Sequence, residues 1–118
     1  MEAHVEGITK KFKLDGMELY VTANADENGR LYEVFVHGAG TEGSFTRAMF
    51  DSFAILFSLA LQGGTELSTI ARKFHDMKFD PQGFTGDPEI PQARSILDYI
   101  TKWLVSRFGD DDLKKEIL

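Results

Sequence analysis

The chain has 118 residues, of which 42% are apolar and 27% charged, a composition that predicts one globular domain and excludes intrinsic disorder. The formal net charge of −6 lacks the basic surplus that neutralises phosphates in nucleic-acid-binding proteins, so we expect no nucleic acid partner. The absence of cysteine excludes disulfides, thiolate metal sites and thiol nucleophiles. The N-terminus shows no secretory signal, and the longest apolar tract (residues 53–61) cannot span a bilayer. We therefore expect a cytoplasmic protein with no membrane contact.

The first third of the chain predicts three antiparallel strands. Residues 11–14 alternate polar and apolar side chains, and Asp15-Gly16 marks a turn. Residues 17–24 alternate in the same way. Residues 26–29 (DENG) predict a hairpin loop because Asn-Gly tolerates positive φ, and residues 30–37, rich in β-branched and aromatic types, predict the returning strand.

A glycine-rich stretch, residues 38–43, leads into a predicted helix over residues 45–62. Ser44 is the expected N-cap, since its hydroxyl can accept a hydrogen bond from a first-turn amide. Apolar residues occur nearly all round this helix, so we expect it to be central and covered on most sides. Arg47 and Asp51, four residues apart, are expected on its narrow exposed edge.

The remainder of the chain predicts two further helices separated by a long loop. Thr65 is expected to cap a shorter helix that ends near Phe74, and residues 75–92 hold all three prolines and predict a loop. A final helix is predicted over residues 92–108, followed by a charged tail that we expect to be frayed. The order predicts an α+β fold, an antiparallel three-stranded β-meander followed by about three helices packed on one face as a two-layer sandwich. We expect a single domain over residues 1–118, with its core at about 8–108 and flexible termini.

The glycine-rich stretch is one candidate for a binding site. It precedes a helix N-terminus, where exposed amides suit an anion. Its spacing matches neither the P-loop nor the dinucleotide fingerprint, and Glu42 would repel an anion. The alternative is a tight turn that lets the helix pack closely. His37 lies beside this stretch and is the histidine best placed for a site, with a strand-end histidine bonded to backbone as the alternative.

The sequence predicts no catalytic residue, no metal site and no cofactor. The three histidines lack ligand spacing, no Gly-x-Ser-x-Gly elbow is present, and residues 110–112, a run of aspartates, lie in the predicted tail. A small hydrolase or transferase that uses His37 with a nearby acid remains a third hypothesis, for which no orienting partner can be named. The long loop over residues 79–91 is either functional or a packed connection held by Phe79 and Phe84.

Two stretches carry a resemblance to a known family. Residues 83–90 (GFTGDPEI), 93–100 (ARSILDYI) and 102–104 (KWL) resemble the region near the C-terminus of adenosylcobalamin (vitamin B12)-dependent, class II ribonucleotide reductases. Residues 18–22 (ELYVT), 33–36 (EVFV) and 58–61 (SLAL) are similar to the TSCPD domain that those enzymes carry beyond their catalytic barrel. The resemblance covers residues 8–108.

The resemblance implies a non-catalytic accessory or regulatory module that binds a nucleotide or docks on a ribonucleotide reductase subunit. The family pattern has cysteines at positions equivalent to about Gly16, Phe45 and Phe79, and this chain has none of them. A zinc or thiol-redox role for such cysteines therefore cannot apply here. The catalytic barrel and the cobalamin site of those enzymes do not fit into 118 residues.

The expected ligand contacts form two groups. The first surrounds the glycine-rich stretch and the second lies near the signature loop: His37, Thr41, Ser44 and Arg47; Asp87, Arg94 and Asp98. The alternative function is a homodimeric structural or interaction protein with no ligand. Its basis is that Phe45, Phe50 and Trp103 present more apolar surface than one small core can bury.

Overall fold

A computed structural model describes residues 6–38 and 44–118 of the chain. They fall into two compact units, of which the first contains residues 6–11 and 18–65 and the second contains residues 12–17 and 66–118. Three antiparallel strands precede the helices, and a separate two-stranded sheet is present, so the α+β class is confirmed. The single domain over residues 1–118 stays a prediction.

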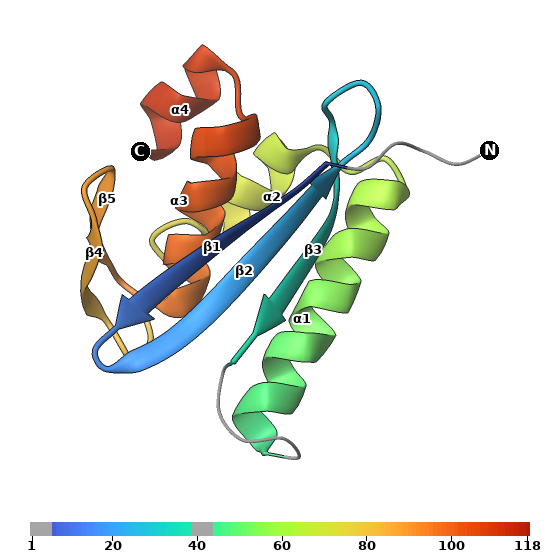
Figure 1. Cartoon of the computed structure of the whole chain (residues 1–118). Helices are drawn as coiled ribbons and strands as arrows, with labels where there is room; N and C mark the ends of the chain where they lie inside the picture. Colours follow the sequence, from blue (N-terminus) through green and yellow to red (C-terminus); the bar gives the residue numbers. More distant parts are fainter. Residues whose placement is uncertain (1–5, 39–43) are drawn as a thin grey trace. The chain divides into compact units, whose positions relative to one another are not determined.

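The three-stranded sheet has the order β1-β2-β3 (Figure 1). Its strands are β1 (Glu6–Leu14), which begins earlier than predicted, β2 (Met17–Ala25) and β3 (Leu31–His37). The predicted turn at Asp15-Gly16 is confirmed, with φ of 49° and 83°. In the predicted loop at residues 26–29, Asp26 Oδ1 accepts hydrogen bonds from the amides of Asn28 and Arg30, each at 2.9 Å. This side chain replaces water as the partner of two turn amides and fixes the hairpin.

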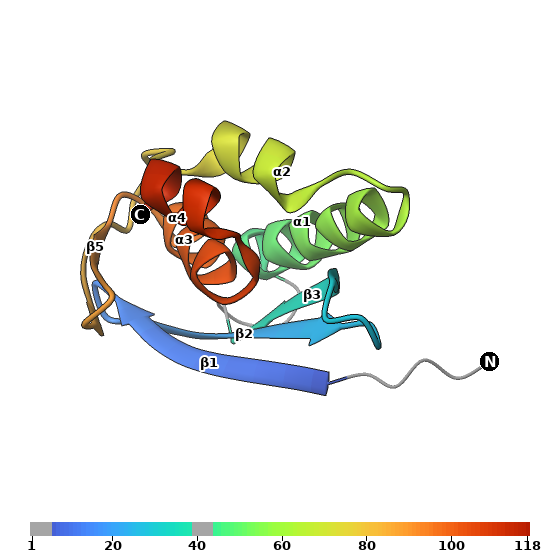
Figure 2. The same cartoon turned by 90° about the horizontal axis from the view of Figure 1, so that it is seen from above.

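Helix α1 (Phe45–Gln62) runs beside β3 and lies on one side of the sheet (Figures 1 and 2). The predicted cap is confirmed, because Ser44 Oγ accepts a hydrogen bond from the Arg47 amide at 3.1 Å. Ser58 Oγ accepts from the Val34 amide at 2.9 Å and donates to the Val34 carbonyl at 3.1 Å. Since β3 is an edge strand, these two bonds satisfy backbone groups that an edge leaves unpaired.

The expectation that α1 is covered on most sides is wrong. Its buried residues are only Ala54, Phe57, Ser58 and Leu61. A sheet contacts a helix along one stripe, and five of the large apolar side chains of α1 stay exposed: Phe45, Met49, Ile55, Leu56 and Leu59. The amount of apolar sequence in a helix is therefore a poor measure of how much of it is buried.

The second unit contains α2 (Leu67–Phe74), α3 (Ile96–Phe108) and α4 (Asp111–Ile117). Helix α3 contacts both of the others (Figure 2). The frayed tail is a wrong expectation, because residues 111–117 form α4, with the Asp110 carboxylate accepting from the Leu113 amide at 2.8 Å. Leu113 and Ile117 are buried in one cluster with Ala71 and Val105. One apolar pair at i, i+4 thus anchors a helix that is otherwise charged.

The predicted loop over residues 75–92 is also partly wrong. It contains β4 (Gly83–Asp87), which pairs antiparallel with β5 (Ile90–Ala93). The final helix begins at Ile96, not at residue 92, because Ser95 Oγ accepts from the Asp98 amide at 2.9 Å and caps it. Thr65 does not cap α2, whose N-cap is Glu66 without a side-chain hydrogen bond. Among the described residues, no helix has the length and apolarity needed to cross a membrane.

Candidate functional site

An exposed apolar stripe follows α1 in the first unit. Each of its members is more than half exposed, and Phe45 reaches 78%. Positions 45, 49, 56 and 59 recur at the helical spacing that places side chains on one face, and Ile55 lies beside them. The stripe consists of Phe45, Met49, Ile55, Leu56 and Leu59. The charged residues of α1, Arg47 and Asp51, form an ion pair at 3.6 Å, so no unpaired charge of α1 disturbs this stripe.

The first group of predicted ligand contacts is only partly placed. Thr41 lies outside the described residues. Ser44 and Arg47 take part in the start of α1, where the hydroxyl of Ser44 caps the helix. His37 is exposed at the end of β3, and its ring stacks on Phe35 with 6.1 Å between centroids. These three described residues hold local structure, and their role in binding stays a prediction.

A groove of about 340 Å³ lies between β3 and α1. It is lined by both elements and includes His37, Ile55 and Leu59. Gln62 Nε2 donates to the Tyr32 carbonyl at 3.0 Å, next to the two bonds of Ser58 to Val34. Because α1 side chains occupy these backbone groups of the strand edge, an added peptide strand would have to displace them. The groove extends the apolar stripe but does not form a strand-addition site.

In the second unit, a buried polar cluster anchors the β4–β5 hairpin. Tyr99 Oη donates to Asp87 Oδ2 at 2.8 Å, and Asp87 Oδ1 accepts from the Glu89 amide at 2.9 Å. Thr85 Oγ1 donates to the Ile90 carbonyl across the turn. Burial, and then the bond to Asp87, raise the pKa of the Tyr99 phenol far above its usual value. Asp87, predicted as a ligand contact, is 7% exposed and holds the hairpin on α3.

Asp98, another predicted ligand contact, is fully buried and surrounded by donors. Its carboxylate accepts from the amides of Asp76 at 2.6 Å and Arg94 at 2.9 Å, and it lies 3.2 Å from Lys102 Nζ. Lys102 also contacts Asp76 at 2.8 Å, and this hydrogen bond holds the pKa of the Asp76 carboxyl below its usual value. The network joins the start of α3 to the segment after α2. Its role is structural and was not predicted from the sequence.

Arg94 is the member of the second group that is exposed to solvent. Its side chain lines an open hollow of about 460 Å³ together with Lys78, Gln82 and Gln92, residues that the sequence did not single out. The Phe79 amide donates to the Arg94 carbonyl at 3.1 Å, which brings Lys78 next to Arg94. The sequence gives little indication of this hollow, because the lining residues come from three short segments and share no motif.

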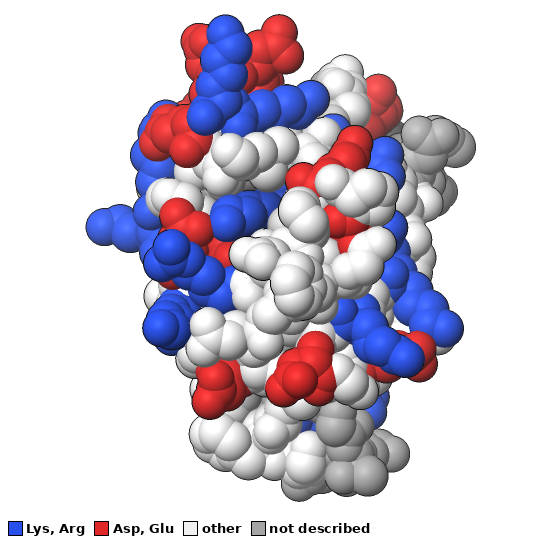
Figure 3. All heavy atoms as spheres, turned by 90° about the vertical axis from the view of Figure 1, so that its left-hand side faces the viewer, with Lys and Arg blue, Asp and Glu red and all other residues white. Residues whose placement is uncertain are grey.

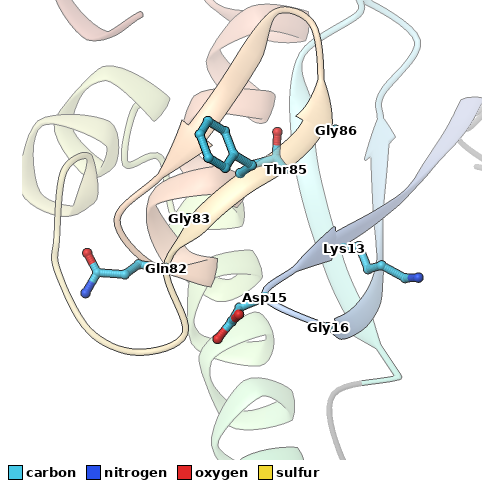
Figure 4. A pocket seen from close by; sticks show the side chains of 8 residues that line it. Lys13, Asp15, Gly16, Gln82, Gly83, Thr85 and Gly86 are labelled. Carbon is cyan, nitrogen blue, oxygen red and sulfur yellow. The ribbon is translucent and has the colours of Figure 1, made fainter.

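A second hollow, of about 590 Å³, shares Gln82 and Gly83 with the first (Figure 4). Its walls come from the β1–β2 turn, including Asp15, and from β4. Its polar side chains are those of Lys13, Asp15, Gln82 and Thr85, which offer basic, acidic and neutral hydrogen-bonding groups. Phe84, 76% exposed, also lines this hollow.

No group of three histidine or acidic side chains converges as a metal site among residues 6–38 and 44–118. The histidines His37 and His75 lie in different units. The Nδ1 atom of His75 lies 2.9 Å from the Ala71 carbonyl, and its Nε2 lies 3.7 Å from Asp76.

The sequence comparisons agree with the resemblance. The TSCPD domain model matches residues 2–107. The chain belongs to the TSCPD domain family. Vitamin B12-dependent ribonucleotide reductases are similar to it: 42% identity over 102 residues for the Streptantibioticus cattleyicolor and Streptomyces coelicolor proteins, and 37% over 108 residues for the Rhodopirellula baltica protein. No solved structure matches the chain significantly.

This TSCPD domain covers only a small part of those relatives. The matches include 86%, 86% and 90% of this chain but 17%, 10% and 10% of the three reductases, respectively. The chain is therefore homologous to the TSCPD region of much longer polypeptides. Both signature segments of the resemblance, 83–90 and 93–100, lie in the second unit, where they build the hairpin and the start of α3.

Proposed function

We propose that this TSCPD domain is a non-catalytic accessory module that docks on the polypeptide of a vitamin B12-dependent ribonucleotide reductase. The observation that carries the proposal is the exposed apolar stripe of α1. Contiguous apolar surface on a small domain marks a contact with another protein. Burying such surface in an interface is favourable by about 25 cal/mol per Å² of apolar area. An amphipathic helix face is a common docking element.

The reductase is favoured as the partner by the relationship between the chain and its relatives. In those proteins the matching region is part of a polypeptide about six to ten times as long as the match. A module of this family then has a covalently attached surface against which its apolar helix can pack. The stripe carries no unpaired charge, which fits an apolar patch on the partner.

The test is a direct binding measurement by titration calorimetry. The partner is the Streptomyces coelicolor reductase with its TSCPD-matching segment removed, so that the docking surface is free. We expect a dissociation constant in the micromolar range, about −8 kcal/mol. Leu56→Glu places a charge in the centre of the stripe and should weaken binding at least about thirtyfold.

Leu118→Glu is the matched control, because Leu118 is a leucine of similar exposure that lies outside α1. It should bind as the unchanged chain does. A Leu56→Glu variant that binds equally well, or an unchanged chain that does not bind, would show that α1 does not dock on the reductase.

A homodimer is the second candidate, favoured by the same stripe, since a self-complementary apolar patch can pair with its own copy. Sedimentation of the isolated chain separates the two candidates. A dimer that Leu56→Glu converts to a monomer supports self-association, whereas a monomer at high concentration excludes it. Nucleotide binding, the other role that we propose, uses a different surface in the second unit.

A further inference from the structure

Three short segments of the second unit converge at one edge of the β4–β5 hairpin. The hydrogen bond from the Phe79 amide to the Arg94 carbonyl joins the segment that carries Lys78 to the end of β5. Gly83 pairs with Ala93 across the hairpin, so Gln82 approaches the same edge from the start of β4. The result is the hollow lined by Lys78, Gln82, Gln92 and Arg94, which we call the basic hollow.

The basic hollow keeps its positive charge. No acidic side chain belongs to its lining, and neither Lys78 nor Arg94 forms an ion pair with any residue that the structure describes. The carboxylates of Asp76 and Asp98 are bound by Lys102 and by backbone amides. The Asp80 carboxylate accepts from Gln82 Nε2 at 3.1 Å, so it contacts one lining residue of the hollow.

Figure 3 shows lysine and arginine side chains on one face of the molecule with aspartate and glutamate side chains among them. The positive charge of the basic hollow is therefore that of Lys78 and Arg94, and not that of a wider basic surface.

Phe84 adds an aromatic surface beside the basic hollow. Phe84 pairs with Gln92, and paired residues of an antiparallel hairpin project their side chains from the same face. Phe84 is 76% exposed and lines the second hollow, and its partner Gln92 lines the basic hollow, so the two hollows adjoin the same pair of residues. A flat ring on a fixed hairpin suits stacking.

The hairpin is held in place before any ligand binds. Thr85 bonds to the Ile90 carbonyl, and Asp87 bonds to Tyr99 on α3. The Tyr99 ring in turn stacks on Phe12, with 4.2 Å between centroids. A ligand that binds here therefore loses little affinity to ordering of the protein.

We propose that the basic hollow and Phe84 together bind a nucleoside phosphate. The phosphate groups lie between Lys78 and Arg94, where the guanidinium can donate two parallel hydrogen bonds to an oxyanion. The base stacks on Phe84, and the sugar hydroxyls face the second hollow, where Asp15 and Gln82 accept and donate. This binding does not depend on the docking by α1, because it is a property of the isolated chain.

Calorimetric titration of the whole chain at low salt tests the site with three probes, inorganic triphosphate, ATP and adenosine. We expect ATP to bind more tightly than triphosphate, and adenosine to bind weakest. Arg94→Gln should weaken ATP and triphosphate alike, about tenfold. Phe84→Ser should weaken ATP about tenfold and leave triphosphate unchanged.

Lys115→Gln is the control, because Lys115 is an exposed cation of α4 that lines neither hollow. It should alter no titration by more than about twofold. Arg94→Lys, which retains the charge, should recover part of the triphosphate affinity. The proposal is overturned if ATP does not bind, or if the Arg94→Gln and Phe84→Ser variants bind ATP as tightly as the unchanged chain does. Binding of triphosphate without any preference for ATP would overturn the role of Phe84 and the nucleoside part of the ligand.

Discussion

Helices α1 and α3 contain similar kinds of residues but differ in which of them are buried. Helix α1 buries four of its 18 residues and exposes leucine, isoleucine, methionine and phenylalanine. Helix α3 buries nine of its 13 residues, and two of the nine are the polar residues Asp98 and Thr101. Apolar side chains of α1 are thus exposed to solvent, whereas the Asp98 carboxylate of α3 is buried.

The difference lies in where hydrogen-bond partners are available. Asp98 is buried because amides and Lys102 surround its carboxylate, which offsets the cost of removing it from water. In α1, only Ser58 among the buried residues is polar, and it bonds to β3. The exposed residues of α1 have no such structural partner, which is why we assign them to contact with another protein.

The largest expected effect belongs to Asp98. Asp98→Ala leaves the buried amides of Asp76 and Arg94 without an acceptor and removes one carboxylate from Lys102. We expect the free energy of unfolding to fall by about 3–5 kcal/mol in urea titrations. Asp51→Ala, on the exposed edge of α1, should change it by less than about 0.5 kcal/mol. A loss below about 1 kcal/mol for Asp98→Ala would show that the buried network around this carboxylate does not stabilise the fold.

The strands, the first helix and its cap followed from local patterns in the sequence. Alternation over residues 17–24 and the Asn-Gly pair define a hairpin without help from distant contacts. Ser44 before an apolar run likewise defines a helix start. These signals are local, so they survive when nothing is known of the tertiary structure.

The β4–β5 hairpin did not follow from the sequence because its alternation is reversed. Thr85 and Asp87 point inward and Phe84 points outward, the opposite of a strand that packs by apolar contact. Their burial depends on Tyr99, twelve residues beyond Asp87, and such a distant partner leaves no periodic signal. The basic hollow was missed for the same reason, since Lys78, Gln82 and Gln92 meet only once the hairpin has formed.

Ser58 offers a smaller test of the same comparison within α1. Ser58→Ala leaves the buried amide and carbonyl of Val34 without a partner, so unfolding should become easier by about 1–3 kcal/mol. Ser52→Ala, at an exposed position of the same helix, is the matched control and should be neutral or slightly stabilising, because alanine is the better helix former. Equal effects of the two substitutions in thermal melts would mean that α1 does not protect the edge of β3.

The smallest effect concerns Tyr99 and appears only in alkali. Burial and the bond to Asp87 raise the pKa of Tyr99 in the folded chain above its unfolded value of about 10. Above that pH the unfolded chain loses this proton first, so the contribution is complete below about pH 10 and falls as the pH rises, by up to about 1.4 kcal/mol per pH unit. The Tyr99→Phe variant has no such proton. The difference in free energy of unfolding between the unchanged chain and this variant should therefore shrink by about 1 kcal/mol between pH 10 and pH 11. Unfolding curves that differ by a constant amount from pH 8 to pH 11 would show that the phenol titrates alike in both states, and the buried hydrogen bond that fixes the hairpin to α3 would then be absent in solution.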